Sequence, residues 1–246
     1  MRYFIELAYK GTHFHGWQIQ PDAISVQEVL EKALSTKLQE RISVTGAGRT
    51  DTGVHASFFV AHFDTPEISD TAKLIYGLNH LVGKDIAISK LYLVPKNSHA
   101  RFDAISRTYE YKISFTKDPF SQEIASIFTK ELDVDLMNRA STILFNYIDF
   151  TSFSKLHTDT KTNNCKILGA SWKQTESFLV FTITADRFLR NMVRAIVGTL
   201  LDVGTKKISI SDFKNIIESK NRSNAGTSAP PEGLFLTKIE YPEFIA

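Results

Sequence analysis

Cysteine is almost absent from this chain, since Cys165 is the only one among 246 residues. A single cysteine excludes an intrachain disulfide and a cysteine-based metal site, and this usage is typical of the reducing cytoplasm. Long apolar runs are also missing, and none approaches the roughly 20 residues that a membrane-crossing helix needs. Glu6 interrupts the apolar start of the chain, which disfavours a signal peptide. We therefore expect a cytoplasmic protein that takes no part in a membrane.

A strong excess of either charge sign is lacking as well. The 29 lysines and arginines and 27 aspartates and glutamates give a formal net charge of +2. Such a protein does not coat nucleic acid with uniform positive charge, so any RNA contact requires basic residues gathered on one face. With 43% hydrophobic and 23% charged residues, the composition predicts a globular protein of one large or two ordinary domains.

Hydrophobic periodicity divides the chain into strands and helices. Ser25 and Glu28 form the S-x-x-E pattern of a capping box, which predicts a helix start. The apolar spacing of Met192 and Ile196 predicts the strongest helix, which Gly204 would terminate. This strongest helix is expected at 188–202, and further helices are expected across 74–78 and at 134–145 and 211–219. Strands are expected at 2–8, 41–45, 57–63, 86–93, 109–115, 178–184 and 234–241.

The order of these elements predicts the fold class. Strands and helices alternate without a regular βαβ rhythm, which favours an α+β fold with a mainly antiparallel sheet flanked by helices. A boundary near residue 100 would give two halves of similar make-up, 1–100 and 101–246. The polar, basic segment 154–166 is expected to be a mobile loop.

The most informative stretch is the glycine-rich sequence 46–56, GAGRTDTGVHA. Its glycines allow sharp turns and close approach of another molecule, and it carries one cation, Arg49, and one carboxylate, Asp51. A tight turn capped by its own aspartate is the simplest interpretation. The residues of a phosphate-binding loop are missing. Asp51-Thr52-Gly53 is also typical of aspartic proteases, which need two such carboxylates; a homodimer could supply the second.

The stretch 48–56 resembles the signature of the tRNA pseudouridine synthase A family. Further motifs resemble that family in the family's order over nearly the whole chain: Tyr9-x-Gly11-Thr12, Gly16-Trp17-Gln18, Val26-Gln27, Ala100-Arg101-Phe102, Ser106-Arg107-Thr108-Tyr109, Phe188-Leu189 with Met192-Val193-Arg194, Ile196-Val197-Gly198, and Ala229-Pro230-x-x-Gly233-Leu234-x-Leu236. Two positions depart from the pattern, because Lys10 stands where the family usually has aspartate and Thr52 where it has alanine.

The resemblance implies the pseudouridine synthase fold, with two similar halves and a catalytic cleft between them. It implies a homodimer that binds tRNA and converts uridines 38, 39 and 40 of the anticodon stem-loop to pseudouridine. The rearrangement carries no group away and oxidises nothing, so no cofactor or metal is expected. A non-catalytic RNA-binding protein of the same fold and the dimeric aspartic protease are the alternatives.

The resemblance also assigns roles to residues. Asp51 would be the catalytic nucleophile, kept ionised by the cation Arg194. Tyr109 would stack on the target base and take part in removing its C5 proton, and Leu234 would line the base pocket. Arg49 would occupy the space that the flipped uridine vacates.

Other basic side chains carry weaker signals. Arg190 stands four residues before Arg194, so both are expected to project from one face of the predicted helix, towards RNA or solvent. His13, His15 and His55 lack a third ligand at recognisable spacing. We expect them to be structural or RNA-contacting rather than metal ligands.

Overall fold

The computed structural model describes residues 1–155, 162–243 and 245. Contacts divide the chain into two compact units, one of Met1–Ile105 with Phe235–Ala246 and one of Ser106–Leu234. The chain thus leaves the first unit at residue 105 and returns to it at residue 235, whereas the sequence predicts a single boundary near residue 100. That 1–100 and 101–246 are separate domains stays a prediction. Residues 156–161 of the predicted mobile loop lie outside the described residues.

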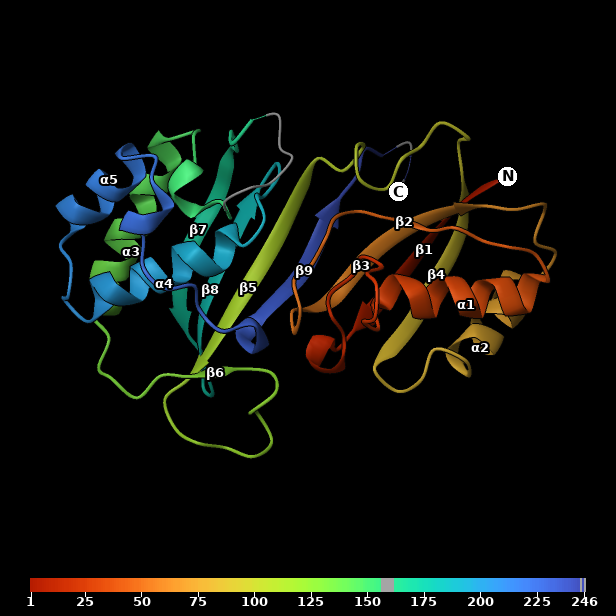
Figure 1. Cartoon of the computed structure of the whole chain (residues 1–246), viewed down its shortest axis with the longest axis horizontal. Coiled ribbons are helices and arrows are strands. Elements are labelled where there is room, and N and C mark those ends of the chain that lie inside the picture. The colour runs from red at the N-terminus through yellow and green to blue at the C-terminus, as the bar shows by residue number, and fades with distance from the viewer. Residues whose placement is uncertain (156–161, 244, 246) are drawn as a thin grey trace. The chain divides into compact units, whose positions relative to one another are not determined.

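The first unit contains mainly antiparallel strands (Figure 1): β1 (Arg2–Tyr9), β2 (Thr45–Gly46), β3 (His55–Asp64), β4 (Ile86–Val94) and β9 (Leu234–Glu240) from its second residue onward. Strand β1 lies between β3 and β4 and is antiparallel to both. Strand β2 is antiparallel to β3. The start of β3 pairs in parallel with β9, where His55 is the register partner of Phe235. The last strand therefore completes the sheet next to the beginning of β3.

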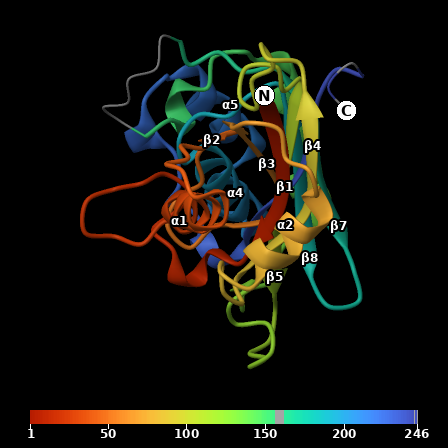
Figure 2. The same ribbon diagram turned by 90° about the vertical axis from the view of Figure 1, so that its right-hand side faces the viewer.

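Two helices, α1 (Val26–Leu38) and α2 (Thr71–Asn79), belong to this unit, and Figure 2 shows α1 to one side of the β1 and β3 ribbons. The side chain of Ser25 accepts a hydrogen bond from the backbone N–H of Glu28 at 3.2 Å, as the capping pattern predicts. The carboxylate of Glu28 instead pairs with Lys32 at 2.6 Å. The buried side chains of α1 recur at helical spacing: Val26, Leu30, Ala33 and Leu34.

The second unit contains the strands β5 (Ser106–Ser114), β6 (Ser126–Ile127), β7 (Ile167–Gln174) and β8 (Leu179–Ala185). Strand β8 lies between β5 and β7 and is antiparallel to both, while β6 is parallel to β5. Alternate residues of β8 are fully buried: Leu179, Phe181, Ile183 and Ala185. Strand β7 was not predicted, because Gly169 and its small neighbours conceal the alternation.

Three helices, α3 (Val134–Ile143), α4 (Met192–Gly204) and α5 (Ile210–Glu218), complete the second unit. Nearly all of α4 is buried, and a side chain at Gly198 would collide with the carbonyl oxygen of Thr227. Segment 226–230 therefore crosses α4 in close contact.

Short 3₁₀ helices occur in both units, at η1 (Gly11–His13), η2 (Leu144–Asn146), η3 (Thr151–Phe153), η4 (Arg222–Asn224) and η5 (Pro231–Gly233).

The predicted α+β class, with a mainly antiparallel sheet flanked by helices, is confirmed. The predicted helix start at 188 is wrong, because α4 begins at Met192. Asn191 before it is left-handed, with φ of 65°, and a helix does not continue through such a residue. In the part of the chain that the structure describes, no helix combines the length and apolar character needed to cross a membrane.

Candidate active site

The loop between β2 and β3 carries Arg49 and Asp51. The N–H of Ala47 donates to Val60 O at 2.8 Å, and the N–H of Val54 donates to Asp51 O at 3.1 Å, so both ends of the loop are held by backbone hydrogen bonds. Between these ends Arg49 is exposed and Asp51 half-buried. The loop therefore presents a cation and a carboxylate two residues apart from a fixed backbone.

The loop after β1 packs directly against this aspartate loop, and two glycines make the approach possible. A side chain at Gly16 would collide with Thr50 O, and one at Gly11 would collide with Val54 O. Gly16 also has φ of 82°, which L side chains rarely adopt. The N–H of Trp17 donates to Thr50 O at 3.3 Å. These contacts fix the residue immediately before Asp51.

Side chains beneath the loop hold the same residue from the core. The hydroxyls of Tyr9 and Thr50 share a hydrogen bond of 2.9 Å, and both side chains are buried. The ring of Trp17 stacks on Phe59 with centroids 4.2 Å apart, and its indole covers Gly46, where a Cβ would overlap it. The backbone flanking Asp51 therefore rests on an aromatic core, which restricts where its carboxylate can go.

His55, the first residue of β3, is structurally engaged. Its Nδ1 accepts a hydrogen bond from the N–H of Gly11 at 3.0 Å, and its ring stacks on Phe235 with centroids 4.5 Å apart. An Nδ1 that accepts carries no proton, so the neutral ring has its proton on Nε2. His13 lies on the surface, 3.1 Å from Asp85 Oδ2, and His15 is exposed. The described residues contain no group of three side chains suited to holding a metal ion.

Tyr109 lies on β5 in the second unit, half-buried, with Ile183 of β8 as its register partner. The ring of Phe188 meets it edge-on, with centroids 5.1 Å apart and an interplanar angle of 86°. This geometry is favourable for aromatic pairs and fixes the plane of the Tyr109 ring.

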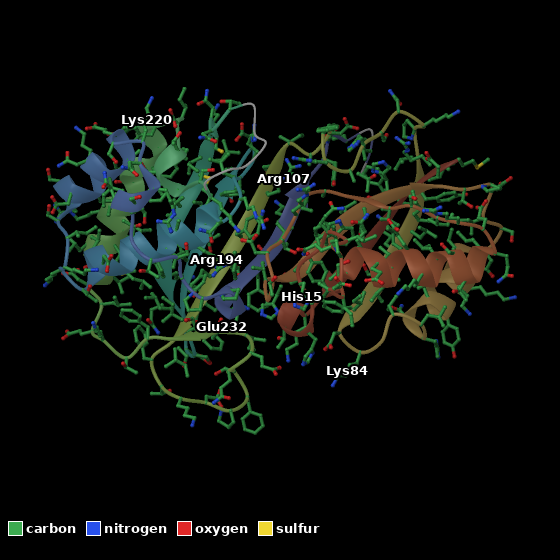
Figure 3. The ribbon with its side chains drawn as sticks, in the orientation of Figure 1. His15, Lys84, Arg107, Arg194, Lys220 and Glu232 are labelled. Carbon is green, nitrogen blue, oxygen red and sulfur yellow. The ribbon has the colours of Figure 1, made fainter. Side chains whose placement is uncertain are left out.

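Arg194 lies in the first turn of α4 (Figure 3) and is half-buried. Its Nε donates to Ala229 O at 2.7 Å, and the N–H of Ala229 donates to Arg194 O at 2.9 Å. Ala229 is thus hydrogen-bonded to both the backbone and the side chain of this arginine. The paired bonds set the direction of the guanidinium.

Arg190 does not share the predicted helix face with Arg194, because α4 starts only at Met192 and Arg190 precedes it. Its carbonyl oxygen accepts a hydrogen bond from the N–H of Lys155 at 3.1 Å. Leu234 is buried as the first residue of β9, directly after η5.

The predicted residues thus form two sets. Arg49 and Asp51 share one loop of the first unit, and Tyr109, Arg194 and Leu234 belong to the second. Sequence reasoning missed the role of the Ala229 carbonyl, since a backbone oxygen leaves no trace in residue types. It also gave no role to Arg101, although the motif Ala100-Arg101-Phe102 marked it; Arg101 lines a pocket together with Arg49.

A family model described as tRNA pseudouridine synthase matches residues 7–103 and 148–242. An α+β fold with a carboxylate on a glycine-braced loop agrees with that class, and the chain belongs to the tRNA pseudouridine synthase family. It is an isomerase of tRNA modification. The matched ranges include Arg49, Asp51, Arg194 and Leu234, whereas Tyr109 lies between them.

Individual relatives of high sequence identity share one name, tRNA pseudouridine synthase A. The chain is 57% identical over 246 residues to tRNA pseudouridine synthase A of Bacteroides fragilis, covering 99% of this chain and 98% of that one. It is 54% identical to the protein of the same name from Parabacteroides distasonis, covering 98% and 96%. Against that of Bacillus subtilis the identity is 40%, covering 98% and 99%.

Proposed function

We propose that this enzyme converts uridines 38, 39 and 40 of the tRNA anticodon stem-loop to pseudouridine, with Asp51 as nucleophile and the target base flipped out of the stem. The observation that carries the proposal is the half-buried Asp51, held on a braced loop two residues after Arg49. The names of the relatives support the tRNA substrate.

The chemistry needs an anion that can attack and later leave. In the overall reaction the C1′–N1 bond of uridine breaks, the base turns, and a C1′–C5 bond forms. The C5 proton is lost while N1 gains one, so atoms and electrons balance without a redox carrier. A carboxylate suits this role because it attacks C1′ or C6 as an anion and departs as one.

The second set of residues is assigned to the same reaction by its motifs. Arg194 would supply the positive charge that keeps Asp51 ionised next to the substrate. Tyr109, held edge-on by Phe188, would stack on the base and take part in removing its C5 proton. Leu234 would line the base pocket. The bond from Arg194 Nε to Ala229 supports this assignment, since it leaves the guanidinium with one defined direction.

A paired uridine must leave the stack before Asp51 can reach it. Arg49 is exposed on the same loop, and its planar group can stack on bases and bind phosphates. We assign it to the space that the flipped base vacates. We also expect the enzyme to act as a homodimer, as the family resemblance implies, and sedimentation equilibrium of the pure protein tests this.

Tritium release from tRNA labelled at uridine C5 tests the function directly. The pure protein should release tritium, because C5 loses its hydrogen when the new bond forms. Carbodiimide treatment and primer extension should then place pseudouridine at positions 38, 39 and 40. Absence of release would overturn the activity, and modification elsewhere in the tRNA would overturn the position.

A further inference from the structure

A small pocket opens beside the aspartate loop within the first unit. Its volume is about 160 Å³. It is lined by Trp17, Gln18, Gln27, Val44, Thr45, Gly46, Gly48, Arg49 and Arg101. None of these described lining residues carries a carboxylate, whereas two carry a guanidinium. A hollow with two cations and no anion favours a negatively charged occupant.

The size of the pocket restricts that occupant. Pockets that enclose a drug-sized molecule measure about 300–1,000 Å³, so 160 Å³ suits a small group rather than a whole nucleoside. Gly48 adds to the open character, because a Cβ placed there would meet no atom within 4 Å. A phosphate group combines small size with negative charge, and arginine binds it with two parallel hydrogen bonds.

Arg101 reaches this pocket from a turn at residues 98–103 that side-chain acceptors hold in place. His62 Nδ1 accepts from the N–H of Ala100 at 3.1 Å. His99 Nδ1 accepts from the N–H groups of Arg101 and Phe102 at 3.1 and 3.3 Å. The N–H of His99 donates in turn to Asp103 Oδ2 at 2.7 Å. The N–H groups of Arg101 and of its two neighbours are therefore all hydrogen-bonded to histidine side chains. These bonds fix the backbone from which the Arg101 side chain extends.

Arg49 and Arg101 are the positively charged residues of the pocket lining, and the two histidines near the turn add no positive charge at neutral pH. Burial, together with Arg2 and His99, lowers the pKa of His62 to about 4, and burial lowers the pKa of His99. Both rings therefore act as neutral acceptors near pH 7. Arg2 forms a two-bond pair with Asp64 at 2.8 and 2.9 Å, so its charge is balanced outside the pocket lining.

We propose that this pocket binds one phosphate of the tRNA backbone and that Arg101 is the residue that holds it. The inference rests on the proposed function, because it takes tRNA as the substrate. Arg49, which also lines the pocket, belongs to the same loop as Asp51. A phosphate fixed between the two arginines would anchor the strand next to the nucleotide that reacts.

The test measures tRNA binding by the full-length protein at several salt concentrations. Each phosphate contact contributes about 0.9 to the logarithmic salt slope for duplex and about 0.7 for single strands. Arg101→Gln should reduce the slope by about that amount and weaken binding about tenfold at low salt. Arg101→Lys should keep the slope, since it keeps the charge. The matched control is Arg41→Gln, which removes an exposed arginine of the same unit outside the pocket and should leave the slope unchanged.

A second measurement identifies the phosphate. Methylphosphonates placed one at a time along an anticodon stem-loop RNA should reveal one position that weakens wild-type binding but not binding by Arg101→Gln. An unchanged salt slope in Arg101→Gln, or the absence of any such position, would overturn the inference. Thermal melting of each variant, and comparison of Gln with Lys at the same site, separates a folding defect from a loss of charge.

The outcomes also separate this inference from the proposed function. Wild-type protein that modifies positions 38–40 while Arg101→Gln keeps the wild-type slope refutes only the phosphate site. Wild-type protein that modifies another part of the tRNA refutes the assigned position, and the Arg101 comparison still decides whether the pocket binds a phosphate.

Discussion

Asp51 and Arg49 stand two positions apart on one loop, yet they are assigned to different steps of the reaction. Asp51 is half-buried and adjacent to Thr50, which is held by Tyr9 and Trp17, whereas Arg49 is exposed. Replacing Asp51 should therefore abolish the chemical step, whereas replacing Arg49 should impair the flipping of a paired base. The two effects can be measured separately.

Asp51→Asn should abolish pseudouridine formation and leave tRNA affinity largely intact. The amide keeps the shape of the side chain but cannot attack as an anion. Tritium release measures the first effect, and equilibrium binding of unlabelled tRNA measures the second. Turnover by the purified variant above the background of a mock purification would remove Asp51 from the role of nucleophile.

Arg49→Ala should slow modification of the folded stem-loop severely and affect a mismatched target much less. Unstacking and unpairing a base costs a few kcal/mol, and each 1.4 kcal/mol that is no longer offset costs about tenfold in rate. The measurement is the rate of the variant relative to wild type on a paired and on a mispaired target uridine.

Asp51→Ala is the matched control, because it should be inactive on both RNAs alike. If Arg49 merely pairs with the charge of Asp51, the variant-to-wild-type ratio will be the same on both RNAs. An equal ratio would refute the flipping role.

At the scale of elements, the loop after β1 acts as a rigid support for the aspartate loop through Gly16. Gly16→Ala should destabilise the protein by at least about 1 kcal/mol, because it strains a residue at φ of 82° and forces a methyl group against Thr50 O. Urea unfolding followed by tryptophan fluorescence measures the loss of stability. In a Trp172→Phe background the fluorescence comes from Trp17 alone, so it reports on the first unit. Gly48→Ala is the control, and it should change stability by no more than about 0.5 kcal/mol. Equal midpoints for the two variants would contradict the supporting role.

His62 of β3, which accepts a hydrogen bond from the turn at 98–103, should make stability depend on pH. The pKa of His62 is about 4 in the folded protein and about 6.5 when unfolded. Between these values the unfolded chain binds a proton that the folded protein does not, so the free energy of unfolding should decrease as pH falls from 6.5 to 4. Burial is the main cause of the lowered pKa; Arg2 and His99 lower it further, while Asp64 and Asp103 raise it. Urea unfolding at a series of pH values measures the slope.

His62→Gln should flatten that slope, because an amide oxygen can accept from Ala100 without taking up a proton. His15→Gln, which replaces an exposed histidine, should keep the wild-type slope. A wild-type slope in both variants would show that His62 does not determine the acid sensitivity.

At the scale of the whole molecule, local patterns were predictable and distant partners were not. Alternation revealed β1 and β8, and helical spacing revealed α1. The start of α4 was misplaced because the apolar residues before Asn191 continue a helical pattern that a left-handed residue interrupts. The motif marked Asp51, yet nothing near Arg194 in sequence indicates that it bonds to a carbonyl 35 residues away.

The return of β9 to the first unit has a consequence for synthesis on the ribosome. The 129 residues from Ser106 to Leu234 require roughly 10 s of translation at the usual rates. During that time the start of β3 has no partner at Phe235, and the ring of His55 lacks the aromatic face on which it stacks. The second unit, which is continuous in sequence, is complete at Leu234. In this chain the amino-terminal unit therefore closes after the second unit has been made, and β3 gains its partner at His55 only when Phe235 has been synthesised.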